Sequence, residues 1–303
     1  KEDIPTIKAN MTAPENAKPY AAYKELLKYE GDGRLRAVAT GHNKDDQLLM
    51  VIEALAFSYI IEGNEENGYR AISLLKNMLS TFYMAPGILY HNGTTNTYVS
   101  AVVYDWCYPL LTEEDKLYIR YHVEKVVNMM SAHPYPYNPS NSMQWNSAGL
   151  VASAWTATHP FKDDLAFAIA SYDEFPDWYN YIASLLIYEF APYRDYFQKG
   201  ESMFSGTSYG FVGWYTVPWA QRLMKVATGY EPFKEDYERV MFQWIYETTP
   251  EGQIFKSGDD TITELNSTDT IMNYKSYTSS MLLAADDIED PYMASVFKYF
   301  AQQ

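Results

Sequence analysis

The chain has 303 residues, of which 47% are hydrophobic and 17% aromatic, and its formal net charge is −16. This length allows one large domain or two ordinary ones, and the hydrophobic fraction is sufficient for a sizeable core. The negative charge argues against nucleic acid as a partner, because phosphates need basic surfaces, and no apolar run reaches the ~18 residues of a membrane span. A single cysteine, Cys107, excludes an internal disulfide and fits either the cytoplasm or a periplasm.

The first predicted elements follow from turn residues and apolar spacing. Residues 1–17 are polar, contain two prolines and are expected to form an N-terminal arm. A short helix is predicted over 20–29, and a strongly marked one begins at Asp45 and closes at Gly63. Because the next helix, over 66–82, follows after a short connection, the last two are expected to form an antiparallel pair.

A second helical pair is predicted after a loop rich in glycine and asparagine. Its first helix covers 99–110, and Thr112 to Asp115 resembles a capping box that starts a helix ending near residue 131. The helix over 215–228 has Gly229 as its stop signal. Other helices are predicted over 146–158, 161–172, 176–190, 234–247, 268–285 and 291–300.

This sequence of helices, with almost no alternating β pattern, predicts an all-α fold. Regular pairing favours an α/α toroid, or an incomplete version of one, built from helical hairpins over residues 18–303. An irregular all-α domain is the alternative. The loops richest in Gly, Asn, Tyr and His are expected to share one rim, and these loops are 86–97, 133–145, 200–213 and 249–266.

The loop over 200–213 stands out because four of its fourteen residues are glycine. Such a loop lets the backbone approach a ligand closely. Tyr209 lies in it between Ser208 and Gly210, where a phenol is suited to proton transfer or to stacking on a sugar. The alternative is that Tyr209, one of 29 tyrosines, only packs.

Four segments, in this order, resemble the heparinase II/III-like polysaccharide lyases. They are residues 103–114 (VYDWCYPLLTEE), 141–158, 200–215 and 255–260 (FKSGDD). The resemblance implies a bacterial, periplasmic or secreted lyase whose helical domain is followed by a C-terminal β-rich domain. That domain contributes a histidine and sometimes a structural zinc in the family. The resemblance therefore also implies that the 303 residues alone are poorly active.

The chemistry of such a lyase is removal of the proton at C5 of a uronate and expulsion of the 4-O substituent. Tyr209 is the candidate acid or base, and Asn146 is the candidate donor that neutralises the carboxylate; the alternative for Asn146 is a helix N-cap. Arg222 is a further source of positive charge. The candidates for binding an acidic polysaccharide or oligosaccharide are Asn141, Gln144, Trp145, His42, His91, Tyr215, Trp214 and Arg194.

No cofactor or metal is expected, because no two histidines stand four residues apart on a helix and no Cys/His cluster is present.

Two other functions are compatible with the sequence. A glycoside hydrolase would pair Asp105 with Asp259 or Asp260, ~5–10 Å apart, although Asp105 on an apolar helix is also typical of a buried structural partner. A non-catalytic glycan-binding module would use tryptophans. The tryptophans for this third function are Trp145, Trp214 and Trp219. The glycan, endo or exo action, the oligomeric state and the choice between acid and base for Tyr209 stay open.

Overall fold

A computed structural model describes residues 3–84, 95–130, 135–136, 159–197, 214–234, 242, 245–246 and 278–302. In these ranges the regular secondary structure is helical, and one isolated β-bridge joins His42 to Met84. The predicted all-α class is therefore confirmed for this part of the chain, while the toroid stays a prediction. None of the helices in the described ranges combines the length and the apolar character needed to cross a bilayer.

The contacts divide the chain into two compact units. Unit 1 comprises Lys1–Met143 and Ala166–Pro176, and unit 2 comprises Gln144–Leu165 and Asp177–Gln303. The prediction of one helical domain over residues 18–303 stays a prediction, and each unit is described separately below.

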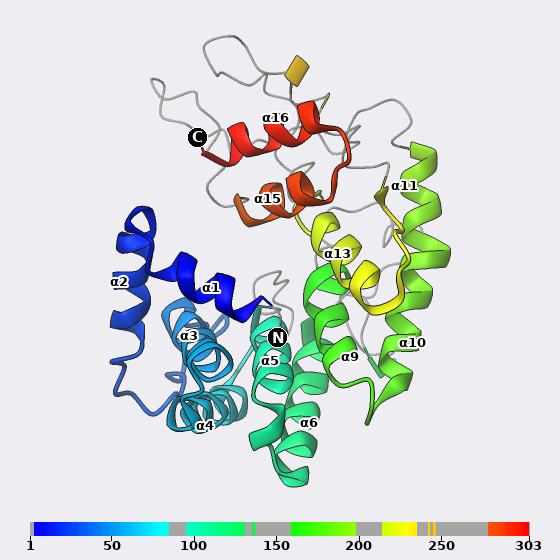
Figure 1. The fold of residues 1–303 in the computed structure, drawn as a ribbon. Helices are drawn as coiled ribbons and strands as arrows, with labels where there is room; N and C mark the ends of the chain where they lie inside the picture. The colour runs from blue at the N-terminus through cyan, green and yellow to red at the C-terminus, as the bar shows by residue number, and fades with distance from the viewer. Residues whose placement is uncertain are drawn as a thin grey trace. The chain divides into compact units, whose positions relative to one another are not determined.

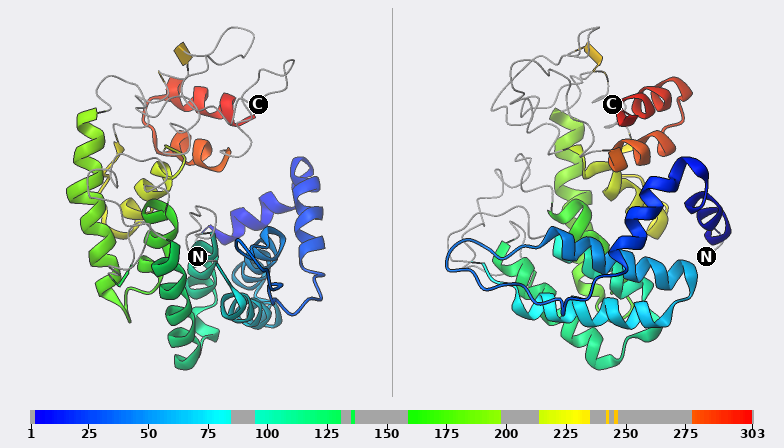
Figure 2. Two further views of the ribbon diagram at one scale, coloured as in Figure 1. Left: turned by 180° about the vertical axis from the view of Figure 1, so that it is seen from behind. Right: turned by 90° about the vertical axis from the view of Figure 1, so that its left-hand side faces the viewer.

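Unit 1 is built mainly from paired helices (Figures 1 and 2). Helix α3 lies against α4 and α5, and α5 lies against α6, as the two predicted pairs require. The predicted arm is helical over much of its length, because residues 4–11 form α1, which contacts α3. The elements of this unit are α1 (Ile4–Met11), η1 (Pro14–Asn16), α2 (Ala17–Leu26), α3 (Asp46–Glu62), α4 (Glu65–Thr81), α5 (Thr95–Trp106), η2 (Tyr108–Leu110), α6 (Glu113–Met130) and α9 (Leu165–Ala170), whose first residue is assigned to unit 2.

The ends of α3 are set by local signals in the sequence. At its start the side chain of Asp45 accepts a hydrogen bond of 2.9 Å from the backbone nitrogen of Leu48, which satisfies one of the free donors of the first turn. At its end Gly63 adopts a φ of 76°, a left-handed conformation that glycine reaches without steric cost. Asn64 then caps α4 by accepting from the nitrogen of Asn67. The predicted limits of this pair are confirmed to within one residue.

The predicted helix over 99–110 ends earlier than expected. Helix α5 stops at Trp106, and residues 108–110 form a 3₁₀ turn. Pro109 explains the break, because it has no backbone N–H and disfavours helical geometry in the residue before it. The capping box is confirmed: the nitrogen of Asp115 donates to the hydroxyl of Thr112, and the nitrogen of Thr112 donates to the carboxylate of Asp115, both at 3.1 Å.

A polar tie joins η2, α6 and the turn after α9, and we call it the Lys116 tie. The ammonium of Lys116 donates to the hydroxyl of Tyr108 at 2.9 Å and to carboxylate oxygens of Glu113 and Glu174 at 3.0 Å each. The hydroxyl of Tyr108 also donates to Glu174, at 2.5 Å. Only 9% of the Lys116 side chain is exposed, so these acceptors replace most of its contact with water.

Unit 2 contains two π-helical segments, each close to a proline. Its elements are η3 (His159–Asp164), α10 (Pro176–Leu185), η4 (Leu186–Phe190), α11 (Ala191–Phe197), α13 (Val217–Thr228), α15 (Thr278–Asp287) and α16 (Pro291–Gln302). Figure 2 shows α10, η4 and α11 as one long helical rod. The ring of Pro192 would clash with a carbonyl one turn earlier in an ordinary α-helix, and the wider turn of η4 lies there. The predicted helix over 176–190 therefore continues to residue 197.

Aromatic side chains fill the interior of unit 2. The ring of Phe161 lies 4.7 Å from that of Phe190 and 5.0 Å from that of Phe233, centroid to centroid. We call these three residues the Phe161 cluster. Tilted and edge-to-face arrangements of this kind are the preferred geometries of aromatic pairs. Helix α13 ends at Gly229, with a φ of 76°, as predicted.

Candidate functional site

His42 is the one glycan-binding candidate of unit 1 in the described residues, and Asn43 holds its loop in place. The side-chain nitrogen of Asn43 donates to the carbonyls of Arg36 and Thr81, at 3.1 and 2.8 Å, and its side-chain oxygen accepts from the nitrogen of Tyr83 at 2.6 Å. Together with the bridge from His42 to Met84, these bonds fix His42 beside the chain that leads into the predicted rim loop 86–97.

The surroundings of His42 lower the pKa of its imidazole. Burial lowers its pKa below the ordinary value of 6.5, Lys44 lowers it further, and Asp46 opposes them. A neutral imidazole can accept a proton or share a hydrogen bond near pH 7. This loop is therefore chemically suited to the edge of a polar binding site.

Arg194 lies in the interior of unit 2. Arg194 is 1% exposed, and its guanidinium carbon lies 5.0 Å from the centre of the Phe161 ring. Guanidinium groups pack on aromatic faces in this way. In the described structure Arg194 therefore contributes to the core, and its contact with a uronate stays a prediction.

Trp214 and Tyr215 precede helix α13. Trp214 is fully buried and its ring stacks on Phe297 of α16, with centroids 5.7 Å apart and planes inclined by 13°. Tyr215 is half-buried. The packing of Trp214 accounts for its position without a sugar, so a direct stacking role would need its ring to leave Phe297. Trp219 is half-buried, and its indole nitrogen donates to Ser280 at 3.2 Å.

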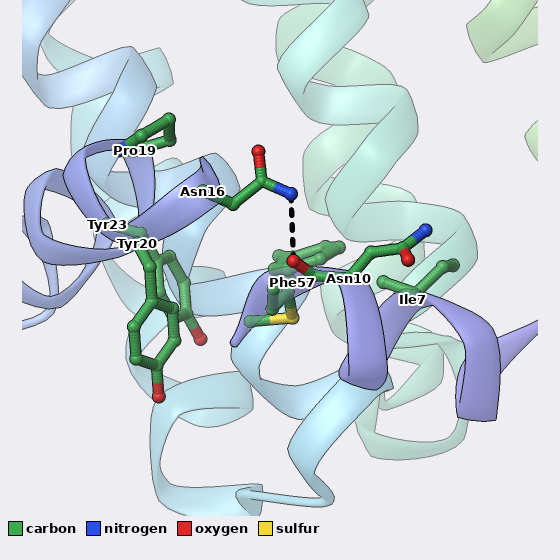
Figure 3. Close-up of a pocket in the computed structure, with 8 residues that line it drawn as sticks. Ile7, Asn10, Asn16, Pro19, Tyr20, Tyr23 and Phe57 are labelled. Carbon is green, nitrogen blue, oxygen red and sulfur yellow. Dashed lines mark hydrogen bonds between the residues drawn. The ribbon is translucent and has the colours of Figure 1, made fainter. Parts of the chain in front are cut away.

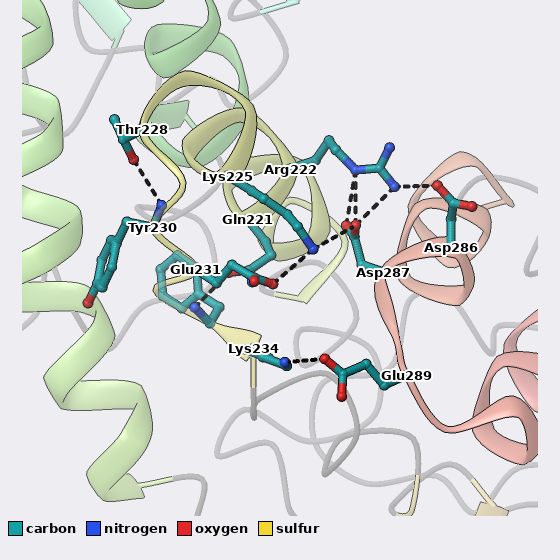
Figure 4. Close-up of polar contacts among 11 residues, drawn as sticks. Gln221, Arg222, Lys225, Thr228, Tyr230, Glu231, Lys234, Asp286, Asp287 and Glu289 are labelled. Atoms are coloured by element: carbon teal, nitrogen blue, oxygen red, sulfur yellow. Dashed lines mark hydrogen bonds and ion pairs between the residues drawn. The ribbon is translucent and has the colours of Figure 1, made fainter.

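Arg222 does not offer a free positive charge. Its guanidinium contacts Asp286 at 2.7 Å and Asp287 at 3.1 Å (Figure 4). Nearby, Lys225 contacts Glu231 at 3.2 Å and Lys234 contacts Glu289 at 2.7 Å. Two carboxylates therefore neutralise Arg222 in this arrangement, and its contact with a uronate stays a prediction.

Asp105, the proposed carboxylate of a hydrolase, is exposed on α5. Burial by the surrounding chain nevertheless raises the pKa of its carboxyl above the ordinary value, so the alternative that Asp105 is a buried structural partner stays a prediction. Its proposed partners, Asp259 and Asp260, lie outside the described residues. Several other predicted site residues also lie outside them, and their placement is not tested; these are Tyr209, Asn146, Asn141, Gln144, Trp145 and His91.

The structure also contains a pocket in unit 1 that the sequence analysis did not identify (Figure 3). It has a volume of about 380 Å³ and lies among α1, η1, α2 and α3. A signal was present in the sequence, since Tyr20 and Tyr23 stand three residues apart on one helix and so share a face. The lining residues are Ile7, Asn10, Met11, Asn16, Pro19, Tyr20, Tyr23 and Phe57.

The chain matches no protein-family profile and no curated protein sequence. His42 belongs to unit 1, whereas Arg194, Trp214 and Tyr215 belong to unit 2.

Proposed function

We propose that this chain is the helical part of a polysaccharide lyase that cleaves a uronic-acid-containing glycan by β-elimination, in the periplasm or outside a bacterial cell. The observation that carries the proposal is the order of the four segments at 103–114, 141–158, 200–215 and 255–260, each of which resembles its counterpart in heparinase II/III-like lyases. The helical character of the described residues is compatible with the helical domain of that family.

The proposed reaction needs a group that withdraws charge from the uronate carboxylate. The chain has a net charge of −16, and Arg222 is already paired with two aspartates, while Arg194 is buried on Phe161. We therefore assign the neutralising role to neutral donors, with Asn146 first and Gln144 and Asn141 behind it. Such donors stabilise charge that develops on the carboxylate as the transition state forms.

The proton transfers are assigned to Tyr209. A base removes the proton at C5, the electron pair forms a double bond between C4 and C5, and the bond from C4 to the leaving oxygen breaks. The leaving oxygen takes a proton from an acid, so that atoms and charge balance. A tyrosine can act at either step, although its ordinary pKa of ~10 means that a basic role requires help from its surroundings.

The test is to incubate the longer parent protein, because the resemblance implies that the 303 residues alone are poorly active, with a panel of glucuronate, mannuronate and neutral glycans and to follow ultraviolet absorbance. Only elimination creates an absorbing unsaturated uronate, so we expect the absorbance to rise with a uronate glycan and not with the neutral ones. New reducing ends without this absorbance would instead indicate hydrolysis and would contradict the proposal.

The matched variants are Tyr209→Phe and Tyr215→Phe, which remove the same hydroxyl from two tyrosines in the same segment. We expect Tyr209→Phe to lower kcat by ~10²–10⁴-fold, the usual contribution of a general acid or base, with a smaller change in KM. Asn146→Ala is expected to lower kcat by ~10²–10³-fold. If Tyr209→Phe kept more than half of the activity while Asp105→Asn abolished it, the hydrolase would replace the lyase.

A further inference from the structure

The pocket among α1, η1, α2 and α3 combines aromatic surface with polar edges. The rings of Tyr20 and Tyr23 are stacked, with centroids 6.0 Å apart and planes inclined by 29°. Phe57 meets Tyr23 edge to face, with centroids 5.8 Å apart. Figure 3 shows the two tyrosines on one side of the pocket and Ile7 and Asn10 on the other. A volume of about 380 Å³ lies within the range of small-ligand sites.

Two side-chain amides stand at the edge of this aromatic surface. The amide nitrogen of Asn16 donates to the backbone carbonyl of Asn10 at 2.8 Å, which fixes the Asn16 side chain and leaves its oxygen as an acceptor. The side chain of Asn10 is exposed. An amide carries donors and an acceptor close together, a pattern that matches neighbouring hydroxyl groups on a sugar better than it matches an apolar side chain.

A cation that lies over the two tyrosine rings has a carboxylate partner. The ammonium of Lys24 lies 5.6 and 5.7 Å from the centres of the Tyr20 and Tyr23 rings, and it also contacts Glu62 at 3.6 Å. Since this cation has a carboxylate partner, the pocket does not depend on a charged ligand. Ring stacking and amide hydrogen bonds are its available means of recognition.

A second hollow continues the aromatic surface along α3. It has a volume of about 230 Å³ and shares Phe57 with the first. The ring of Trp106 lies 5.9 Å from that of Phe57, and Glu53 adds a polar group to the lining. Because their linings share Phe57, the two hollows are neighbours, as the sites for two adjacent rings of one glycan must be.

We infer that the pocket of Tyr20, Tyr23 and Phe57 binds a pyranose ring of a glycan, and that the hollow at Trp106 holds the next ring. The ligand class rests on the proposed function. The site itself is separate from the proposed chemistry, because none of its lining residues belongs to the four predicted rim loops. It holds the polymer without cleaving it.

The test uses calorimetry to measure the binding of three tetrasaccharides. The first consists of glucuronate with N-acetylglucosamine, the second of mannuronate and the third of glucose. Saturation-transfer NMR is the second readout. We expect Tyr20→Ala to weaken binding by ~3–10-fold, the range that one aromatic contact supplies. Tyr20→Phe keeps the ring and should bind as the natural chain does. Tyr69→Ala is the matched control, because Tyr69 is 54% exposed on α4 of the same unit and should leave affinity unchanged.

The outcomes separate this inference from the proposed function. Unsaturated product formed equally by the natural chain and by Tyr20→Ala, with equal affinities, would overturn the pocket and leave the lyase standing. Binding that is lost in Tyr20→Ala, without any unsaturated product from the longer parent protein, would support the pocket and contradict the lyase. If the apolar dye anilinonaphthalene sulfonate bound the natural chain but not Tyr20→Ala, and no tetrasaccharide displaced it, the pocket would be an apolar docking surface and the inference would be wrong.

Discussion

The Lys116 tie of unit 1 and the Phe161 cluster of unit 2 both join segments that are distant in sequence, but they use different interactions. The tie relies on the ammonium of Lys116, which donates hydrogen bonds of 3.0 Å to the carboxylates of Glu113 and Glu174. The cluster relies on three rings, with Arg194 lying on one of them. The Lys116 tie depends on the ionisation of its ammonium and carboxylates, and the Phe161 cluster depends on the volume that its rings fill. Unit 1 should therefore respond to pH through the tie, and unit 2 should respond to the removal of ring atoms.

The largest effect should come from Phe161→Ala. Phe161 is fully buried and contacts Phe190, Phe233 and Arg194, so its truncation leaves a cavity that three neighbours cannot fill. We expect a loss of ~3–5 kcal/mol in the free energy of unfolding, measured in denaturant. Tyr188→Ala, at a tyrosine that is 77% exposed in the same unit, should change it by less than ~0.5 kcal/mol. Equal effects of the two would mean that the cluster is not a packed core.

The next effect compares two glycines with positive φ, one in each unit. Gly33 has a φ of +79°, and a Cβ there would lie 2.8 Å from the Cα and carbonyl oxygen of Leu74. Gly229 has a φ of +76° with no atom within 4 Å of the same position. Both alanine variants carry conformational strain of ~1–2 kcal/mol, and Gly33→Ala adds a backbone clash. We therefore expect Gly33→Ala to lower the unfolding free energy by at least ~1 kcal/mol more than Gly229→Ala does. Equal losses would show that the backbone at Leu74 moves away freely.

The Lys116 tie predicts an acid-sensitive contribution to stability. Burial acts to raise the pKa of Glu174, but hydrogen bonds from Tyr108 and Lys116 outweigh it and hold the pKa below its ordinary value of 4.5. The unfolded chain therefore binds the proton more readily than the folded chain does. The contribution is complete above about pH 4.5 and is lost as the pH falls through the lower folded pKa.

Glu174→Gln tests this contribution. It removes the charge and keeps the shape, and we expect it to cost ~1.5–3 kcal/mol at neutral pH and progressively less in acid. Unfolding curves measured at about pH 7 and about pH 3 on both proteins provide the comparison. Tyr188→Phe, at an exposed tyrosine of unit 2, is the control and should leave the acid dependence of stability unaltered. A constant difference between the two proteins at both pH values would contradict the proposed ionisation.

The sequence was most informative where the structure depends on neighbouring residues. Asp45 and Gly63 set the ends of α3, and Thr112 with Asp115 begins α6, since caps act within a single turn. The neutralisation of Arg222 could not be predicted in this way, because its partners lie 64 and 65 residues away. The pocket of Tyr20 and Tyr23 was missed for a different reason, although the two tyrosines share a helix face. Its far side comes from α1, and residues 4–11 lack a marked apolar face that would predict a packed helix.

The smallest effect concerns two threonines that precede helices, one in each unit. Replacing them by valine should change the unfolding free energy with opposite signs. The hydroxyl of Thr112 accepts from the nitrogen of Asp115 at 3.1 Å and donates to its carboxylate at 2.7 Å. The hydroxyl of Thr216, before α13, is buried without a hydrogen-bond partner among the described residues. Thr112→Val removes the cap and should lower the unfolding free energy by ~1 kcal/mol. Thr216→Val removes an unsatisfied hydroxyl of similar volume, so the unfolding free energy should stay the same or rise by up to ~1 kcal/mol. Denaturant curves of the two variants decide the sign. If Thr216→Val were the more damaging change, its hydroxyl would have a partner, and the contrast between the two threonines would be wrong.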